Sequence, residues 1–494
     1  MSTTQHPPAN ASLVERLDAL YEYDREPVAE NKLHGWKTFI AMFSGEHVAG
    51  TEFVLGPLMV LHGVSAFDFF VGLLIGNTLA VLSWALLCAP VAVKVRLTIY
   101  WQLRKICGPY LTVIYSAFYA VILCLLAGSM VSVAVTAISI PFDIPNPNYI
   151  AGDVIPTVPW MFLALVVGIV IAALAVLGFD KIAHFSKICA PWMVLVFFAA
   201  GIAVLADLGT NGFTDFSRVA TEKIFTGIPI GNNSKYTIWH IIGFSWLCNA
   251  TQHIGMADLT IFRYAKSWKQ GFASAFGMFL GHYMAWIASG ILCAAFLAEG
   301  LTNPQPGNIA LFGAGAAGLI SVVIAGWTTA NPTLYRAGLA IQVATPNWKR
   351  WKVTFLAGVF MIITACIPAV NAYLDRIIGY YGLFFMPLGA FIFVDVWLFP
   401  KLGLISDYAE KAKLLISWPA TLAWFGSLFI MIFFYGKDNY EWLSNWLGEQ
   451  PSWLAAIQTD LMFLIAPEWF LSVLMYTGFS MIQQKSEASK IALS

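Results

Sequence analysis

A short segment near the start of the chain places two carboxylates and two glycines inside a run of apolar residues. The run reads WKTFIAMFSGEHVAGTEFVLGPLMVLHG, and its polar centre contains Ser44, Gly45, Glu46, Gly50 and Glu52. An ionisable group inside a bilayer costs roughly 2.5–3.5 kcal/mol on insertion scales, so such groups usually face a bundle interior and mark a pathway. The glycines and carboxylates together predict a discontinuous helix, whose freed carbonyl groups can coordinate a cation. The alternative is that either carboxylate lies near a helix end and is hydrated.

A second polar segment lies within an apolar run near the middle of the chain. The sequence GFSWLCNATQHIGMADLTIFR contains the ring of Trp246 and the amides of Asn249 and Gln252. A flat ring can stack on a tryptophan while amides recognise its hydrogen-bonding edge. The alternative is that Trp246 only packs, since the chain has 19 tryptophans. Asp258 and Arg263, near the end of this segment, are expected to cap and anchor the helix.

A third polar segment, AGWTTANPTLYRAGLAIQ, carries adjacent hydroxyl groups at Thr328 and Thr329. Hard cations prefer oxygen ligands of this kind, especially beside backbone carbonyls. A threonine pair in a membrane helix usually bonds its own backbone instead. The pair is therefore a candidate Na⁺ site that needs support from elsewhere in the chain.

Arg336 lies seven residues after Thr329 and therefore on roughly the same face of a helix. A buried arginine needs a charged partner. Glu46 and Glu52 are the candidates for that partner.

These segments lie in a chain with the composition of a membrane protein. Of 494 residues, 59% are hydrophobic and 11% are charged, whereas soluble domains carry roughly 25% charged residues. The mean hydropathy is +0.73. The 27 basic and 27 acidic residues balance, so the net charge does not indicate a nucleic-acid partner. The sequence therefore predicts an all-α membrane protein.

About twelve apolar runs are long enough to cross a bilayer as helices, which takes about 20 residues each. They lie near residues 36–62, 64–90, 110–139, 159–178, 188–208, 237–259, 271–299, 309–342, 353–371, 373–400, 416–436 and 452–476. The runs 309–342 and 373–400 are long enough to contain a break or a short surface helix.

The distribution of lysine and arginine predicts the orientation of these spans. With twelve spans and an inner N-terminus, the even-numbered loops hold 15 basic residues and the odd-numbered loops hold 5. Cytoplasmic loops are the basic ones, so both termini are expected to be cytoplasmic and the location is the inner (plasma) membrane. Residues 1–35 are polar and lack the apolar region of a cleavable signal. The expected organisation is an N-terminal segment 1–35, one transmembrane domain 36–476 and a tail 477–494.

Other function classes lack their motifs in this sequence. The seven cysteines stand singly, without the spacing of a metal site or a disulfide framework. We find no glycine-rich phosphate loop, HExxH motif or nucleophile elbow, so we expect neither an enzyme nor a cofactor. A channel or a transporter-like sensor is a less favoured alternative, because the 18-residue tail after Tyr476 is too short for a signalling domain.

Three stretches resemble the nucleobase:cation symporter-1 family, which includes cytosine permease and the hydantoin transporter. The most specific is WTTANPTLYRAGL, Trp327 to Leu339, and the second is VSAFDFFVGLLIGN, Val64 to Asn77. The third is the sixth-span pattern of Gly243, Trp246, Asp258, Thr260 and Arg263. These motifs cover about a fifth of the chain, whereas the twelve-span layout covers all of it.

The resemblance implies a LeuT-type fold of two five-helix inverted repeats and two further helices. In such proteins spans 1 and 6 are broken, and substrate lies between them and spans 3 and 8. Carried over from sodium-coupled members, the Na⁺ ligands are Thr328, Thr329 and the carbonyl of Ala325, with carbonyls at Gly45 and Val48. Trp246 becomes a stacking residue in the same comparison.

The chain departs from the family pattern at several positions. The acidic pair Glu46 and Glu52 is unusual for the first span, and the third span offers only Phe118 or Tyr119 in place of a stacking tryptophan. Where cytosine permease has Asn-Asp-Asn, this chain has Ala330, Asn331 and Pro332, and Arg336 adds a charge. The residues predicted to contact substrate are Glu46, Glu52, Phe118, Tyr119, Trp246, Asn249, Asn331 and Arg336.

Two hypotheses for the function follow. The first is uptake of a small nitrogenous ring compound, of the purine, pyrimidine, hydantoin or allantoin-like class, coupled to Na⁺ or H⁺ by alternating access. The second keeps the fold but transports a cationic amine or amino-acid-like solute, with Glu46 as its counter-ion. The expected partners are this solute and the lipid bilayer, and the oligomeric state is open.

Overall fold

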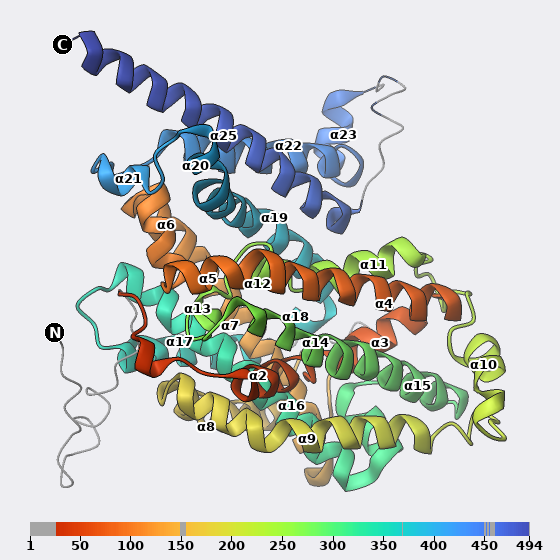
Figure 1. Cartoon of the computed structure of the whole chain (residues 1–494). Helices are drawn as coiled ribbons and strands as arrows, with labels where there is room; N and C mark the ends of the chain where they lie inside the picture. The colour runs from red at the N-terminus through yellow and green to blue at the C-terminus, as the bar shows by residue number, and fades with distance from the viewer. Residues whose placement is uncertain are drawn as a thin grey trace, which may run out of the picture.

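The computed structural model describes residues 26–148, 155–367, 369–448, 451, 454 and 460–493, which form a bundle of helices joined by short loops (Figure 1). The β-structure of these described residues amounts to two isolated bridges. Residues 1–25 of the predicted N-terminal segment lie outside the described residues, as do residues 149–154 of the loop before the fourth span.

The first five spans and their connections come first in the chain. They comprise α2 (Trp36–His47), α3 (Glu52–Leu61), α4 (Ala66–Ser83), the π-helical η2 (Trp84–Cys88), α5 (Ala89–Val95), α6 (Ile99–Cys107), α7 (Pro109–Ile138), α8 (Val158–Val176) and α9 (Phe179–Ala203).

The next five spans follow a loop that holds α10 (Phe216–Val219). They comprise α11 (Ile238–Leu247), α12 (Ala250–His253), α13 (Leu259–Phe262), η6 (Trp268–Ala273), α14 (Ser274–Gly277), the π-helical η7 (Met278–Tyr283), α15 (Met284–Ala298), α16 (Pro306–Ala344), α17 (Arg350–Ala365), α18 (Ala369–Ala372), α19 (Leu374–Phe393), η8 (Val394–Leu398) and α20 (Phe399–Leu402).

The last two spans are α22 (Trp418–Asn439) and α25 (Leu461–Leu493), with the short helices α21 (Tyr408–Lys411) and α23 (Glu441–Leu447) beside them. Figure 1 shows α22 and α25 on one side of the bundle, next to α19.

The described helices confirm the predicted count of about twelve spans. Nine helical segments are long and apolar enough to cross a membrane by length and composition. The first span is α2 with α3, the sixth is α11 with α12, and the ninth is α17, which has 16 residues. The two broken spans stand five apart, at the start of each expected five-helix repeat.

The first span is interrupted where the sequence predicts it. α2 ends at His47 and α3 begins at Glu52, so the chain crosses the middle of the bundle without helical structure. Gly50 permits the close packing of this break: a Cβ there would lie 2.7 Å from Val133 Cγ1 of α7 and 3.5 Å from the Cα of Gly326 in α16. A larger residue would push the break away from both helices.

The span boundaries differ from expectation in two places, and one of the two long runs contains a break, as its length allowed. α9 begins at Phe179 rather than near 188, because the helix continues through the polar residues that precede the apolar run. The long run in α16 contains a break, with a φ of 54° at Gly315. α25 continues to Leu493, so the predicted tail at 477–494 begins inside a helix rather than after one.

Interior packing places the two breaks at the centre of the bundle. α16 packs along α7, α9 and α17, while α3 packs on α15 and α4 on α11. α2 lies against α9, α14 and η7. The halves of both broken spans therefore pack against other spans of the bundle.

The loops predicted to be cytoplasmic gather at one end of the bundle. The Arg96 guanidinium donates to the carbonyls of Arg263 and Ala265, at 3.1 and 2.5 Å. At the same end, the Gln484 side chain near the end of α25 bonds the backbone of Ile405 in the loop after α20. An even number of spans agrees with this arrangement, because it brings the end of the last helix to the same side as these loops. The side of the membrane on which they lie is a prediction from loop charge.

Candidate functional site

A cavity of about 90 Å³ lies where the two helix breaks meet. Both halves of the first span, the break of the sixth span, η7, α7, α16 and α19 contribute to its wall. The polar side chains on that wall include Glu46, Glu52, Asn249, Gln252, His282 and Tyr381. Of the predicted substrate residues, Glu46, Glu52 and Asn249 therefore meet in one cavity.

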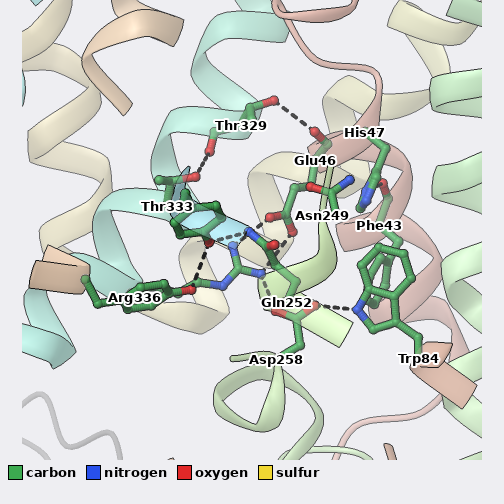
Figure 2. A network of polar contacts seen from close by, with 12 residues as sticks. Phe43, Glu46, His47, Trp84, Asn249, Gln252, Asp258, Thr329, Thr333 and Arg336 are labelled. Atoms are coloured by element: carbon green, nitrogen blue, oxygen red, sulfur yellow. Dashed lines mark hydrogen bonds and ion pairs between the residues drawn. The ribbon is translucent and has the colours of Figure 1, made fainter. Parts of the chain in front are cut away.

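Glu46 and Arg336 form an ion pair at one edge of this cavity (Figure 2). Arg336 Nη1 lies 2.6 Å from Glu46 Oε1, and Nη2 lies 2.7 Å from Asp258 Oδ1. The Arg336 side chain is 2% exposed, so two carboxylates satisfy one buried guanidinium. This pairing confirms Glu46 as the partner that the sequence offered for Arg336.

Asp258 has a larger role in this network than the helix cap expected from sequence. Its second carboxylate oxygen accepts a hydrogen bond from Trp84 Nε1 at 2.7 Å, and its first binds Arg336 (Figure 2). Tyr100 adds a hydrogen bond from its hydroxyl to the Arg336 carbonyl at 3.0 Å. The network thus joins the first, second, sixth and eighth spans on the predicted cytoplasmic side of the cavity.

Glu52 occupies a separate position on the cavity wall. It is the first residue of α3, is 2% exposed, and accepts a hydrogen bond from the indole N–H of Trp286. Ser289, one turn further along α15, donates its hydroxyl to the Glu52 backbone carbonyl at 2.7 Å. His282 Nε2 lies 3.5 Å from Glu52 Oε1.

The π-helical turn η7 carries His282 beside Glu52 and packs against His47 of α2. The side-chain amide of Asn77 donates to the carbonyl of Met278, at the first residue of this turn, at 3.0 Å. Gly281 lets the turn approach α2, because a Cβ there would lie 2.4 Å from the His47 carbonyl oxygen. The ring centres of His47 and His282 are consequently 5.0 Å apart. Single π-turns of this kind often occur at functional sites.

Thr328 and Thr329 meet the first helix break. The Thr329 hydroxyl lies 3.0 Å from the carbonyl oxygen of Glu46 and 3.1 Å from that of Ala325. The Thr328 hydroxyl lies 3.2 Å from the Ala325 carbonyl. The eighth span thus contacts the broken first span through oxygen atoms.

The carbonyls at the first break provide further oxygen donors. No backbone amide in the described part of the chain donates to the carbonyls of Gly45 and Val48. The two threonine hydroxyls and the Ala325 carbonyl that they share are hard oxygen donors of the kind that small cations prefer.

Five of the eight residues predicted to contact substrate do not line the cavity; one of them, Arg336, pairs with Glu46 beside it. Trp246 turns toward the second span, where its Nε1 donates to Ser83 Oγ at 3.2 Å. Phe118 is 54% exposed and packs on Phe384 at the outer surface of the bundle. Tyr119 is buried behind Tyr381, whose hydroxyl lies 3.4 Å from its own.

Asn331 is the last of these residues. Thr329 and Thr333 face the cavity from one side of α16, and the helical repeat turns residue 331 away from that side. Its amide is buried, and neither amide atom has a hydrogen-bond partner in the described residues.

Sequence reasoning missed two residues that shape the Glu52 side of the cavity, His282 and Trp286. Together with Ser289 they stand at positions i, i+4 and i+7, so they share one helix face. Polar and indole groups at this spacing in an apolar span could have indicated a helix face directed at a functional site. Tyr381 gave no such signal, because its neighbours in the tenth span are mostly aromatic or apolar.

A second cavity, of about 300 Å³, lies on the side opposite to the Arg336 network. His240, Arg376 and Asp460 line it, and His240 Nε2 lies 3.0 Å from Asp460 Oδ2. Phe244 lines this outer cavity, and Cys248, one turn later, lines the central one. One turn of the sixth span therefore separates the linings of the two cavities.

Comparison with known proteins identifies the fold. No protein-family model and no curated protein matches the chain. Among solved structures, it is similar to Mhp1, a nucleobase-cation-symport-1 family transporter, in a closed conformation with bromovinylhydantoin bound. That match has a TM-score of 0.67 and 14% identity, and it covers 92% of this chain and 93% of Mhp1.

Two other transporters match over similar lengths. A Na⁺-coupled sialic acid symporter in a substrate-bound outward-open state matches with a TM-score of 0.60 and 13% identity, covering 90% of this chain and 89% of the symporter. MhsT in complex with L-phenylalanine matches with a TM-score of 0.55 and 15% identity, covering 91% of this chain and 99% of MhsT. At these identities the likeness establishes the fold: the protein is a multi-pass helical membrane protein with the LeuT-type architecture.

Proposed function

We propose that this protein is a secondary active symporter that moves a small nitrogen-containing solute together with Na⁺ by alternating access. The observation that carries the proposal is the contact between the eighth span and the first break, where the Thr329 hydroxyl lies 3.0 Å from the Glu46 carbonyl. A cation bound there would hold two mobile parts of the fold together. Broken helices around a central site are the common arrangement in such transporters.

Sodium is the proposed coupling ion because of the chemistry of the donors. The hydroxyls of Thr328 and Thr329 and the carbonyls of Ala325, Gly45 and Val48 are all oxygen donors. Neutral oxygen atoms of this kind can coordinate a hard monovalent cation, and none of them has to gain or lose a proton when the ion binds. The solved sialic acid symporter with the same fold is described as Na⁺-coupled, which supports the assignment.

Glu46 is the residue through which ion binding would influence the cytoplasmic side of the path. Its backbone carbonyl meets Thr329, and its carboxylate pairs with Arg336. A shift of the first span on Na⁺ release would move the carboxylate away from Arg336 and Asp258. We therefore assign the network of Glu46, Arg336 and Asp258 as an inner gate that opens after the ion leaves.

The central cavity is the proposed substrate site. Its wall combines carboxylate, amide, imidazole and hydroxyl groups with the apolar side chains of Leu126, Met130 and Ile378. Such a wall suits a small polar solute with N–H groups. Nitrogenous rings of the purine, pyrimidine, hydantoin and allantoin-like classes belong in the first substrate panel, since Mhp1 was solved with a hydantoin bound.

Uptake into proteoliposomes tests this function. Purified protein is reconstituted with an inward Na⁺ gradient, and accumulation of each radiolabelled solute is compared with an equal K⁺ gradient. We expect Na⁺ to stimulate the uptake of at least one solute. The variant Thr328→Ala with Thr329→Ala should remove the stimulation, whereas Thr328→Ser with Thr329→Ser should keep it because the hydroxyls remain.

The opposite pattern would reject the proposal. Sodium stimulation that persists in the alanine double variant would remove both threonines from the ion site. Accumulation driven equally well by a pH gradient without Na⁺ would replace Na⁺ with H⁺ as the coupling ion.

A further inference from the structure

The central cavity carries an excess of negative charge. Among the described residues in and beside its wall, one cation, Arg336, faces three carboxylates, those of Glu46, Asp258 and Glu52. One positive and three negative charges leave two negative charges in a buried region. When all three carboxylates are ionised, a single Na⁺ at the threonine site compensates one of these charges, and the other requires a cationic partner.

Glu52 is the carboxylate that lacks a cationic side chain. Its hydrogen bond from Trp286 and its position at the first turn of α3 both favour the ionised form, since helix N-termini stabilise negative charge. His282 does not neutralise it. The Asn249 amide nitrogen, which can only donate, lies 3.3 Å from His282 Nε2, so in this arrangement the imidazole is neutral and supplies no positive charge to Glu52.

The amide of Gln252 also presents an acceptor. Its Nε2 donates to the Tyr381 hydroxyl at 3.3 Å, and that hydroxyl in turn donates to Tyr119 at 3.4 Å. One N–H of the Gln252 amide and the hydroxyl of Tyr381 are therefore used within the protein. Gln252 Oε1 has no partner among the described residues, although it is buried.

His47 also presents an acceptor to the cavity. Its Nδ1 lies 2.9 Å from the carbonyl of Phe43 and must carry the hydrogen, because a carbonyl cannot donate. In the neutral imidazole the other ring nitrogen, Nε2, is then an acceptor on a residue that lines the cavity. The hydroxyls of Thr329 and Thr333 likewise donate to backbone carbonyls, those of Glu46 and Thr329, and leave their lone pairs available.

From this excess of acceptors and negative charge we infer the substrate class, on the basis of the symporter function proposed above. The transported solute is a small monovalent nitrogen cation of the protonated amine, amidine or guanidine class. Its charge pairs with Glu52, and its further N–H groups bind Gln252 and His47. The counter-ion is thus Glu52 rather than Glu46, because Arg336 already occupies the carboxylate of Glu46.

Matched pairs of cations and neutral isosteres test this inference with the full-length protein in detergent and Na⁺. The pairs are acetamidinium with acetamide, guanidinium with urea, and benzamidinium with benzamide, each at low millimolar concentration. A ligand that binds the folded state raises the melting temperature by mass action. We expect at least one cation to raise it and its neutral partner to leave it unchanged.

Variants connect the effect to Glu52. Glu52→Gln keeps the shape of the side chain and should weaken cation binding roughly a hundredfold, since one partner of a buried charge pair is lost. Trp286→Phe retains the carboxylate, so it should weaken binding less and preserve the preference for cations. Glu299→Gln, on an exposed loop, should bind as the unmodified protein does.

Three results would overturn the inference. Equal stabilisation by both members of every pair would mean that Glu52 is neutral, and full cation binding in Glu52→Gln would place the counter-ion elsewhere. Stabilisation by none of the cations would reject the class. The symporter proposal fails separately: Na⁺-driven uptake of a neutral ring compound would preserve it while rejecting the cation, and no Na⁺-driven uptake of any solute would reject it.

Discussion

Thr329 and Glu46, which are 283 residues apart in the sequence, meet at the centre of the protein through a hydrogen bond of 3.0 Å from hydroxyl to backbone carbonyl. The Glu46 carboxylate at the same time pairs at 2.6 Å with Arg336, which lies seven residues after Thr329 on roughly the same face of α16. One residue at the first break therefore contacts the proposed ion site through its backbone and the proposed inner gate through its side chain.

Removal of the Arg336 guanidinium should destabilise the protein strongly. Arg336→Met leaves the buried carboxylates of Glu46 and Asp258 without a cation, and such a loss costs about 3–5 kcal/mol. We expect a large fall in melting temperature. Arg218→Met is the matched control, because Arg218 pairs with Asp215 and Glu222 on an exposed surface, where water screens the ion pairs and they contribute little to stability. Equal melting temperatures for the two variants would contradict the importance of the network.

A methyl group at Gly281 should disturb the contact between η7 and the first break. The Cβ of Gly281→Ala would lie 2.4 Å from the His47 carbonyl oxygen, so the turn must move. We expect a destabilisation of about 1–3 kcal/mol, typical of overpacking. Gly478→Ala is the control, since a Cβ there meets nothing within 4 Å. Alanine is also more favourable than glycine in a helix by roughly 1 kcal/mol. The account of η7 is wrong if Gly281→Ala melts as late as Gly478→Ala.

The outer cavity contains a pair that should depend on pH. The hydrogen bond from His240 lowers the pKa of the Asp460 carboxyl below its usual value. A carboxyl group with a lowered pKa in the folded state contributes stability above its unfolded pKa of about 3.9, and the contribution is lost as the pH falls through the folded value. Asp460→Asn should therefore melt slightly earlier than the unmodified protein at pH 6, with the difference closing on acidification. A difference that grows on acidification would contradict the pairing.

The sequence was sufficient for the features that depend on local pattern. Apolar runs predicted the spans, and two glycines with two carboxylates predicted the break between His47 and Glu52. The need of a buried arginine for a partner pointed to Glu46 as one of two candidates. Each of these inferences rests on residue types that are costly to bury, so only a few arrangements can accommodate them.

Features that depend on how helices rotate against one another could not be predicted. Trp246 faces Ser83 instead of the cavity, because the indole N–H finds a hydroxyl on the neighbouring span. Asp258 joins Arg336 from 78 residues away, and no spacing rule connects the two. His282 and Trp286 had a readable helical spacing, but only the packing of α15 against α3 shows that Glu52 is their partner.

Direct binding of radioactive sodium to the purified protein tests the central claim without knowledge of the substrate. The account predicts saturable binding to the unmodified chain, retained in Thr328→Ser with Thr329→Ser and lost in Thr328→Ala with Thr329→Ala. Melting temperatures of the three proteins, measured in K⁺, check that each is folded. Sodium binding that is equal in all three proteins, or absent from the unmodified one, would contradict an ion site between Thr329 and the carbonyl of Glu46.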